Sequence, residues 1–362
     1  MKLRKRIERT GKRLLRNALS GILKTNQIGV DSLDKGSISK ILLVRQDSRL
    51  GNLVLMTPLV SALRASFPSS RLDVMISEGF EDVLSVNPCI SRVHVFRKRA
   101  ARYLPWVYPR FVRNIRQERY DLAIDVSDGH HVSFNNTMLT ALSGARYRMG
   151  YDREEANDLL NIVVPRPPEN VHMADAMIGL ARFLDAGTLD YPMKYYATED
   201  DRVSMSAWLR DRNIGEMDSF FIVHAGGRGK KQWGGEMFAA LIDLIGSEVG
   251  VKIVLIGGPS EHDIIRDIRE KAVIPFEVLS GVTVGEMAAV IERCDMFISN
   301  DTGPMHVSSA LEKPTVGIFL TSNYRVYGPR GPNGRIVAAS SGKPSIEDVM
   351  MAVMDLIEGR IA

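Results

Sequence analysis

The chain has 362 residues, more than one hydrophobic core usually supports, so its length predicts two domains. A composition of 45% hydrophobic and 25% charged residues excludes a disordered chain, a collagen-like repeat and a disulfide scaffold. The formal net charge is only +4, and no apolar run reaches the roughly 18 residues needed to cross a bilayer. The two cysteines, Cys89 and Cys294, lie far apart beside apolar segments, which favours two buried free thiols in a reducing cytosol over a disulfide.

Positive charge is concentrated at the start of the chain. Residues 1–24 contain nine basic residues against one acidic residue, a net charge of +8, and apolar residues interleave with them at nearly helical spacing. This pattern predicts a basic amphipathic helix, and no continuous apolar stretch follows it as in a signal peptide. Such a helix suits the anionic inner-membrane surface, a role favoured over that of a solvated arm packed on the body. Nucleic acid is disfavoured as a partner because no aromatic platform or known binding module accompanies the charges.

From Ser39 onward, short β-branched runs alternate with helical periodicity, which predicts βαβ units around parallel sheets. In the first half, a helix is expected from Leu53 to Ser66. Strands of this half are expected at Lys40–Val44, Arg71–Ser77, Val93–Phe96 and Leu122–Val126.

The second half repeats the pattern after a linker expected within Gly187–Glu199. Its strands are expected at Ser219–His224, Lys252–Ile256, Met296–Ser299 and Thr315–Phe319. Its helices are expected at Glu236–Ser247, Glu261–Lys271, Val284–Glu292 and Met305–Leu311. A closing helix is expected at Ser345–Ile357, for which packing back on the first domain is an option that the sequence does not require. We therefore expect two doubly wound domains, at residues 25–190 and 191–344, between the N-terminal helix and a C-terminal helical segment at 345–362. Ligands of such sheets bind beyond the carboxyl ends of strands, so a central cleft between the domains is expected.

The most specific motif runs from Ile298 to His306 and reads Ile-Ser-Asn-Asp-Thr-Gly-Pro-Met-His. It leaves a predicted strand and enters a helix, with a proline suited to the first helical position. The free backbone N–H groups of that helix and the Thr302 hydroxyl form a candidate anion site for a diphosphate. Asp301 is a candidate acceptor from a sugar hydroxyl, and His306 a candidate donor to a phosphate. The alternative is a plain helix cap at Asp301 and Thr302 with a histidine in the core.

A second motif, from His224 to Trp233, reads His-Ala-Gly-Gly-Arg-Gly-Lys-Lys-Gln-Trp. Its glycines allow the backbone to approach a ligand, and its cations suit a departing diphosphate. The alternative is a mobile basic loop. The spacing is not that of a P-loop, and no Gly-x-Gly-x-x-Gly opens either half, which argues against a Rossmann-type oxidoreductase.

A third motif follows the first strand, from Arg45 through Asn52 to Thr57-Pro58. Asp47 is the only carboxylate of this loop and is therefore a candidate general base. The alternative is a loop carboxylate paired with Arg45 or Arg49.

Together these three runs resemble the heptosyltransferase family, glycosyltransferase family 9, over nearly the whole chain from about Lys40 onward. Asp301 to His306 is the most specific part of the resemblance, and Lys231-Gln232-Trp233 resembles the family's Lys-x-Trp. Ile256 to Glu261 resembles its strand-to-helix segment, and Tyr120 to Asp125 is a weaker match.

The resemblance implies a GT-B fold and an inverting glycosyltransferase without metal or cofactor, which takes a heptose or related sugar from an ADP-sugar to a lipid-linked saccharide acceptor. It also implies a cytoplasmic protein peripherally associated with the inner membrane. Residues that it implies for the nucleotide sugar are Lys231, Asp301, Thr302, Gly303 and His306, with Glu261 at the ribose, Val282 beside the adenine, and backbone contacts at Gly226 and Gly227. Candidate acceptor contacts are Arg45, Arg49, His130 and His131, together with the basic stretch Arg97–Arg113.

One position departs from the family pattern. The family's first loop usually reads Gly-Asp and supplies the base, whereas this chain has Gly51-Asn52, and an asparagine amide is scarcely basic. Asp47 is favoured as the replacement, with the stretch Asp125–His131 as the alternative. A non-catalytic nucleotide-sugar-binding protein is the competing function, and donor binding without turnover would distinguish it.

Overall fold

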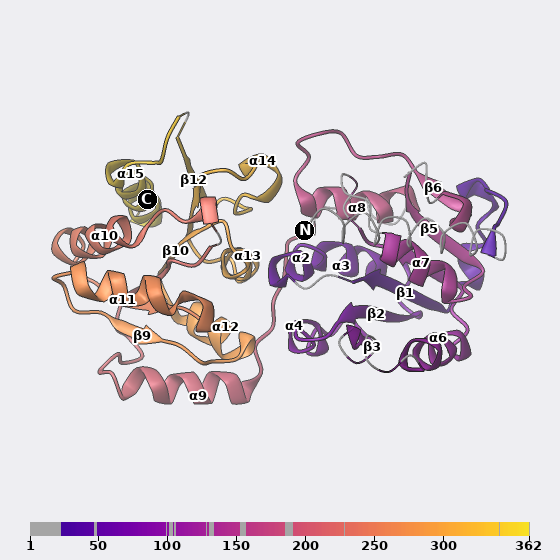
Figure 1. The fold of residues 1–362 in the computed structure, drawn as a ribbon, viewed down its shortest axis with the longest axis horizontal. Helices are drawn as coiled ribbons and strands as arrows, with labels where there is room; N and C mark the ends of the chain where they lie inside the picture. The colour runs from indigo at the N-terminus through magenta and orange to yellow at the C-terminus, as the bar shows by residue number, and fades with distance from the viewer. Residues whose placement is uncertain are drawn as a thin grey trace. The chain divides into compact units, whose positions relative to one another are not determined.

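The computed structural model describes residues 23–46, 49–98, 100, 104, 106–127, 129, 134–152, 157–184, 191–227, 229–339 and 341–361. Asp47, His130, His131, most of the predicted N-terminal helix and part of the predicted linker therefore lie outside the described residues. The chain divides into two compact units, each a parallel sheet with helices around it (Figure 1). The first contains residues up to Ser48 and Met56–Tyr191, and the second contains Arg49–Leu55 and Pro192–Ala362.

The first unit is built on a six-stranded sheet of order β3-β2-β1-β4-β5-β6, in which every pair is parallel. Its strands are β1 (Lys40–Arg45), β2 (Arg71–Ser77), β3 (Arg92–Phe96), β4 (Leu122–Asp125), β5 (Tyr147–Tyr151) and β6 (Ile162–Val164). The central strand β1 contains the unbroken apolar run Ile41–Val44, whose Ile41 pairs with Leu72 on one side and Leu122 on the other, as expected for a strand buried on both faces.

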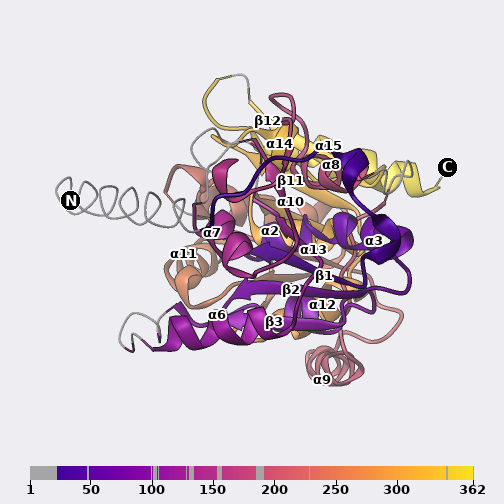
Figure 2. The same cartoon turned by 90° about the vertical axis from the view of Figure 1, so that its right-hand side faces the viewer.

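Helices cover both faces of this sheet, as in a doubly wound fold (Figure 2). They are α3 (Thr57–Ser66), α4 (Asp82–Ser85), α6 (Val107–Gln117), α7 (Phe134–Leu142) and α8 (Met173–Phe183). Helix α3 packs against α8, and α6 packs against α7.

The second unit repeats the topology with the order β12-β11-β10-β7-β8-β9. Its strands are β7 (Phe220–His224), β8 (Lys252–Ile256), β9 (Glu277–Leu279), β10 (Met296–Asn300), β11 (Thr315–Phe319) and β12 (Gly334–Ala338). Its helices are α2 (Leu50–Val54), α9 (Glu199–Arg210), α10 (Gly235–Glu248), α11 (His262–Lys271), α12 (Val284–Arg293), α13 (Gly303–Ala310), α14 (Tyr324–Tyr327) and α15 (Ile346–Ile361). Helix α15 belongs to this unit, where it packs against α10 and β12.

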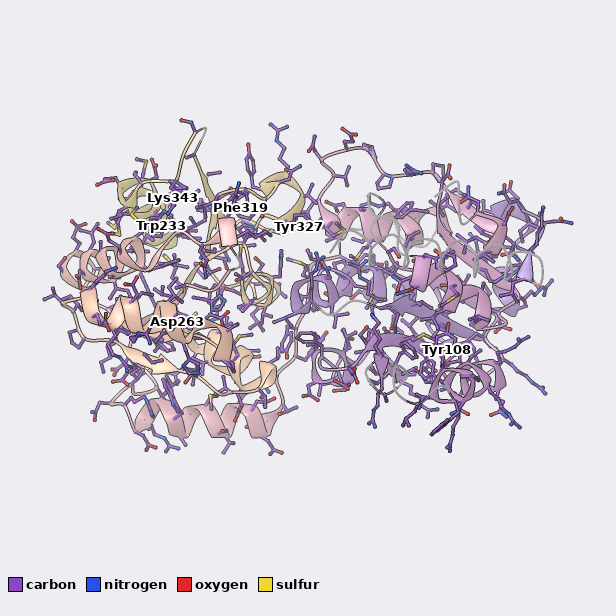
Figure 3. All side chains as sticks on the ribbon, in the orientation of Figure 1. Tyr108, Trp233, Asp263, Phe319, Tyr327 and Lys343 are labelled. Carbon is purple, nitrogen blue, oxygen red and sulfur yellow. The ribbon has the colours of Figure 1, made fainter. Side chains whose placement is uncertain are left out.

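The core of the second unit is organised around Trp233, which is fully buried (Figure 3). Its ring meets Phe238 edge to face with centroids 5.2 Å apart, and its Nε1 donates to the Pro344 carbonyl at 2.8 Å. Lys343 Nζ donates to the Trp233 carbonyl at 3.0 Å, so the segment before α15 is fastened to the loop after β7.

The prediction of one helix over Leu53–Ser66 was wrong. The structure has two helices, α2 and α3, because Pro58 lies at the start of α3. A proline has no N–H to donate to the carbonyl four residues earlier, here that of Val54 at the end of α2, and its ring clashes with that carbonyl. The two cysteines are free as expected, but only Cys294 is buried.

Within the described part of the chain, no helix is both long and apolar enough to span a bilayer.

Candidate functional site

The carboxyl edge of the second sheet collects the residues that the sequence assigned to a nucleotide sugar. The neighbouring strands β10, β7, β8 and β9 are parallel, so the loops that follow them leave from one edge. These loops carry Asp301 and Thr302 after β10, Gly226 and Gly227 after β7, Glu261 after β8 and Val282 after β9. The order reverses between β7 and β10, and such a switch point is where doubly wound sheets bind ligands.

Asn300 fastens the ends of β10 and β7 to each other. Its Nδ2 donates to the Gly226 carbonyl at 2.7 Å and to the Ala225 carbonyl at 3.3 Å. The sequence motif contained Asn300 without a role for it, and the available signal was an amide at the end of an otherwise apolar strand. Asn300 is fully buried, and its two bonds hold the backbone of the segment with Gly226 and Gly227, here called the glycine loop.

Two buried polar atoms at this edge lack a partner. The Asn300 Oδ1 and Thr302 Oγ1 atoms are shielded from solvent and have no hydrogen-bond partner among the residues that the structure describes. Thr302 is the N-cap of α13, its backbone is extended, and no side-chain cap bond is formed. Because the N–H groups of a first helical turn have no partner within the helix, this helix start offers donors to an anion.

Lys231 and Asp301 form an ion pair across the two loops. The Lys231 Nζ lies 2.5 Å from Asp301 Oδ2, and the side chains are 44% and 9% exposed. Lys231 stands in a short 3₁₀ helix, η4 (Gly229–Lys231), directly after the glycine loop. A half-exposed lysine contributes little to stability through such a pair. The cation is therefore available to exchange its carboxylate for a phosphate oxygen.

The glycine loop packs directly on the imidazole of His224. A Cβ added to Gly226 would lie 2.4 Å from His224 Nε2, and Gly227 has φ +145°, so neither position accepts a side chain without strain. His224 Nδ1 donates to the Ile256 carbonyl at 2.9 Å, which leaves Nε2 as the acceptor nitrogen. Burial lowers the pKa of His224, while the Ile256 bond and the charge of Glu261 oppose that effect less strongly. The ring is therefore neutral at physiological pH.

Glu261 and Val282 complete the edge on the far side of β7. The Glu261 carboxylate accepts from the Gly258 N–H at 2.9 Å and from Ser260 Oγ at 2.6 Å, which holds it at the turn into α11. Val282 is half-buried between β9 and α12.

Within the second unit, α2 packs against α13, and a Cβ on Gly51 would lie 2.5 Å from the His306 ring. Both His306 and Asn52 are buried.

In the first unit, a buried network joins the carboxyl ends of β1 and β4. Both oxygens of Asp125 are bonded: Oδ1 accepts from the Ser127 N–H and hydroxyl at 2.9 and 2.5 Å, and Oδ2 accepts from Thr137 Oγ1 at 2.6 Å. Asn136 Nδ2 donates to Ser127 Oγ, and its Oδ1 accepts from the Gln46 N–H at 2.8 Å. The network therefore fixes the backbone residue immediately before Asp47.

Arg45 and Arg49 differ in exposure. Arg45 is buried, and its Nη1 donates to the Val126 carbonyl, which ties β1 to the loop after β4. Arg49 is exposed at the N-terminus of α2. Among the described residues, no group of three or more His, Cys, Asp and Glu side chains is placed to hold a metal ion.

Comparison with known proteins agrees with this architecture. The model of the family described as glycosyltransferase family 9 (heptosyltransferase) matches residues 108–354. Lipopolysaccharide heptosyltransferase 3 of Escherichia coli is 24% identical over 303 residues, which cover 78% of this chain and 84% of that protein.

Two solved structures show the same fold. The glycosyl transferase family 9 protein from Veillonella parvula DSM 2008 has a TM-score of 0.81 at 22% identity, covering 92% of this chain and 100% of that one. The E. coli heptosyltransferase WaaC with ADP-2-deoxy-2-fluoro heptose has a TM-score of 0.63 at 22% identity, covering 89% and 99% of the two chains. The expected GT-B fold is confirmed. Because the family match spans more than half of its length, the chain belongs to glycosyltransferase family 9, the heptosyltransferase family, and is a glycosyltransferase.

Proposed function

We propose that this glycosyltransferase transfers a heptose from ADP-heptose to a saccharide of a lipopolysaccharide core. The observation that carries the proposal is the carboxyl edge of β10-β7-β8-β9. This edge holds the start of α13, the loop with Gly226 and Gly227, and Lys231, together with two buried polar atoms that have no partner among the described residues. Two of its relatives support these substrates, since one is a lipopolysaccharide heptosyltransferase and another was solved with ADP-2-deoxy-2-fluoro heptose.

In this proposal the second unit binds the donor. Lys231 and the first turn of α13 face the diphosphate, and they stabilise the negative charge that grows there as the sugar departs. Thr302 donates its hydroxyl proton to a phosphate oxygen, and the glycine loop contributes backbone N–H groups. Glu261 accepts from the ribose hydroxyls, Val282 lies against the adenine, and Gly303 and His306 shape the wall around the phosphates. Transfer is inverting and uses these protein charges in place of a metal.

Asp47 is the proposed general base. A base must reach the acceptor hydroxyl, and Asp125 is unsuited because it is fully buried with both oxygens occupied by Ser127 and Thr137. Asn52 has no basic atom. Gln46 directly precedes Asp47, and its backbone N–H is bonded to Asn136. The network of Asp125 and Asn136 would therefore position Asp47. Arg49, His130 and His131 are proposed acceptor contacts.

The test is turnover of ADP-heptose by the purified chain with a truncated lipopolysaccharide acceptor. Asp47→Asn is expected to lower kcat by about 10²-fold or more while ADP affinity is kept, because only the proton transfer is lost. The matched control is Asp82→Asn, an exposed carboxylate in α4 of the same unit, which is expected to leave kcat unchanged. A wild-type chain that binds ADP-heptose but turns over no acceptor would favour the nucleotide-sugar-binding alternative.

We also propose that residues 1–24 hold the enzyme at the cytoplasmic face of the inner membrane, where a lipid-linked acceptor is concentrated. Their net charge of +8 and interleaved apolar residues support this role. Deletion of residues 1–24 is expected to weaken binding to anionic vesicles. Unchanged vesicle binding after the deletion would refute it.

A further inference from the structure

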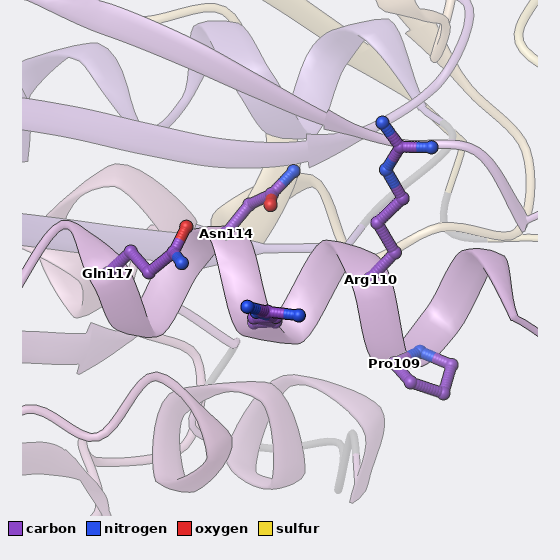
Figure 4. Close-up of a pocket in the computed structure, with 5 residues that line it drawn as sticks. Pro109, Arg110, Asn114 and Gln117 are labelled. Carbon is purple, nitrogen blue, oxygen red and sulfur yellow. The ribbon is translucent and has the colours of Figure 1, made fainter.

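Helix α6 presents two unlike faces. Phe111 packs against Phe96 with ring centroids 5.1 Å apart, and Ile115 is almost completely buried, so this side belongs to the core of the first unit. The opposite side carries Arg110, Arg113 and further polar residues in a row. Figure 4 shows Pro109, Arg110, Asn114 and Gln117 along this one helix, where together with Arg113 they line a shallow hollow.

The residues that the structure describes do not neutralise the positive charge of this face. In the described part of the chain, no ion pair is formed by Arg110, Arg113, Arg116 or Arg119. The one acidic residue between Arg97 and Arg119 is Glu118, and its two oxygens are engaged by Arg71 at 3.0 Å and Arg92 at 2.9 Å. A solvated helix surface usually alternates the two signs of charge, whereas this one carries a single sign.

This concentration of charge is large for the chain as a whole. Residues 97–119 hold eight basic residues and one acidic residue, a net charge of +7 in a chain whose total is +4. Since residues 1–24 carry a further +8, everything else has a net charge of −11. Residues 97–119 are thus a strongly cationic segment in a chain that is acidic outside this segment and residues 1–24, and a polyanionic surface is the complementary partner.

An exposed tryptophan stands at the start of the same helix. Trp106 is 63% exposed and Leu104 is 41% exposed, whereas Trp233 is completely buried. A tryptophan ring with a polar N–H and an apolar body is favoured in the headgroup layer of a membrane, and arginines beside it pair with lipid phosphates. Single-stranded nucleic acid would require a series of aromatic platforms, and the described part of this face offers one ring.

We propose that the outer face of α6, with Trp106 at its start, docks on an anionic phospholipid bilayer. Arg110 and Arg113 pair with headgroup phosphates, and the Trp106 ring enters the headgroup layer. This surface is distinct in sequence from residues 1–24, and its binding needs neither donor nor acceptor. The proposal therefore stands independently of the proposed reaction.

The experiment measures co-sedimentation of the full chain with vesicles of equimolar phosphatidylcholine and phosphatidylglycerol, and with vesicles of phosphatidylcholine alone. Each cation near an anionic surface contributes about five-fold to the partition constant, so Arg110→Gln combined with Arg113→Gln is expected to weaken binding by roughly 30-fold. Replacing both arginines with lysine keeps the charge and is expected to keep binding within a few-fold. The matched control replaces Arg266 and Arg269, exposed on α11, with glutamine and is expected to bind like the wild type.

A second readout follows the tryptophan. Anionic vesicles are expected to shift the fluorescence of the wild type to shorter wavelength, and Trp106→Phe is expected to abolish that shift. Circular dichroism melts of each variant check that the fold is intact. Wild-type binding by the double glutamine variant would overturn the proposal, as would equal losses in the α11 control. Stronger retention on single-stranded RNA than on anionic vesicles would overturn it in favour of a nucleic-acid surface.

Discussion

His224 predicts a specific dependence of stability on pH. Its ring is buried at the carboxyl end of β7, between the Ile256 carbonyl that accepts from Nδ1 and the backbone of Gly226 that lies against Nε2. Burial lowers the pKa of the folded-state ring below its ordinary value of 6.5. In the unfolded chain the same imidazole is solvated and titrates normally.

The sign follows from proton counting. Below about pH 6.5 the unfolded chain binds a proton at this residue that the folded chain does not, so acidification favours unfolding. The part of the free energy of unfolding that depends on a neutral His224 is fully present above the pKa of the unfolded state, and it is lost as the pH falls below that value. If the folded ring stays neutral throughout, lowering the pH from about 7.5 to about 5.5 decreases the free energy of unfolding by about 1.4 kcal/mol through His224 alone.

The assay is urea unfolding of wild type and His224→Asn at both pH values. Asparagine retains an N–H that can reach the Ile256 carbonyl but carries no titrating ring. Other groups that titrate in this range contribute to both proteins, so the difference between the two pH dependences isolates His224. The variant is expected to lose about 1.4 kcal/mol less than the wild type on acidification. Equal losses would show that the folded ring takes up a proton, and the reasoning from burial would be refuted.

Three further substitutions test the loops that follow β10 and β7. Thr302→Val is expected to leave the melting temperature unchanged or raised, because the hydroxyl has no partner among the residues that the structure describes. The same change is expected to weaken ADP binding about 10-fold in calorimetry, because a phosphate oxygen loses its donor. Gly226→Ala is expected to lower the free energy of unfolding by about 1–3 kcal/mol in urea unfolding, because the new methyl group collides with the hydrogen-bonded His224 ring. An unchanged unfolding midpoint would show that the ring moves freely. Trp233→Phe is expected to lower the free energy of unfolding by about 1–3 kcal/mol in the same assay, because the buried Pro344 carbonyl loses its N–H; a neutral result would show that water replaces it.

Much of the fold follows from local sequence patterns. The predicted strand Lys40–Val44 contains the apolar run Ile41–Val44, and it forms all of β1 except Arg45. The strands β5, β6, β9 and β12 were not predicted. Strands β6 and β9 have only three residues each, β5 is interrupted by Arg148 and Gly150, and β12 lies at the edge of its sheet with one buried residue. The break between α2 and α3 was also missed, although Pro58 supplied the signal.

The site was predictable to the extent that its residues follow strand ends. Asp301, Thr302 and Lys231 are placed at one edge because parallel strands end together, and that much is contained in the order of elements. The hydrogen bonds that hold this edge together could not be predicted from the sequence. Asn300 reaches carbonyls 74 and 75 residues away, and Gln46 is held by a side chain 90 residues later. Contacts over such separations leave no periodicity in the sequence.

Two buried polar atoms where β10 leads into α13, Asn300 Oδ1 and Thr302 Oγ1, have no partner in the described part of the chain, and they bear on the function of this edge. A buried polar atom without a partner costs about 1–3 kcal/mol, and natural folds keep few of them. Asn300 Oδ1 and Thr302 Oγ1 lie two residues apart at the entrance of α13, beside a lysine whose carboxylate partner is exchangeable. A purely structural edge would gain stability by replacing Thr302 with an apolar residue. Retention of the hydroxyl, together with the uncapped first turn of α13, is consistent with a polar ligand that supplies the missing partners, and a nucleoside diphosphate has oxygens suited to the Thr302 hydroxyl and the helix N–H groups.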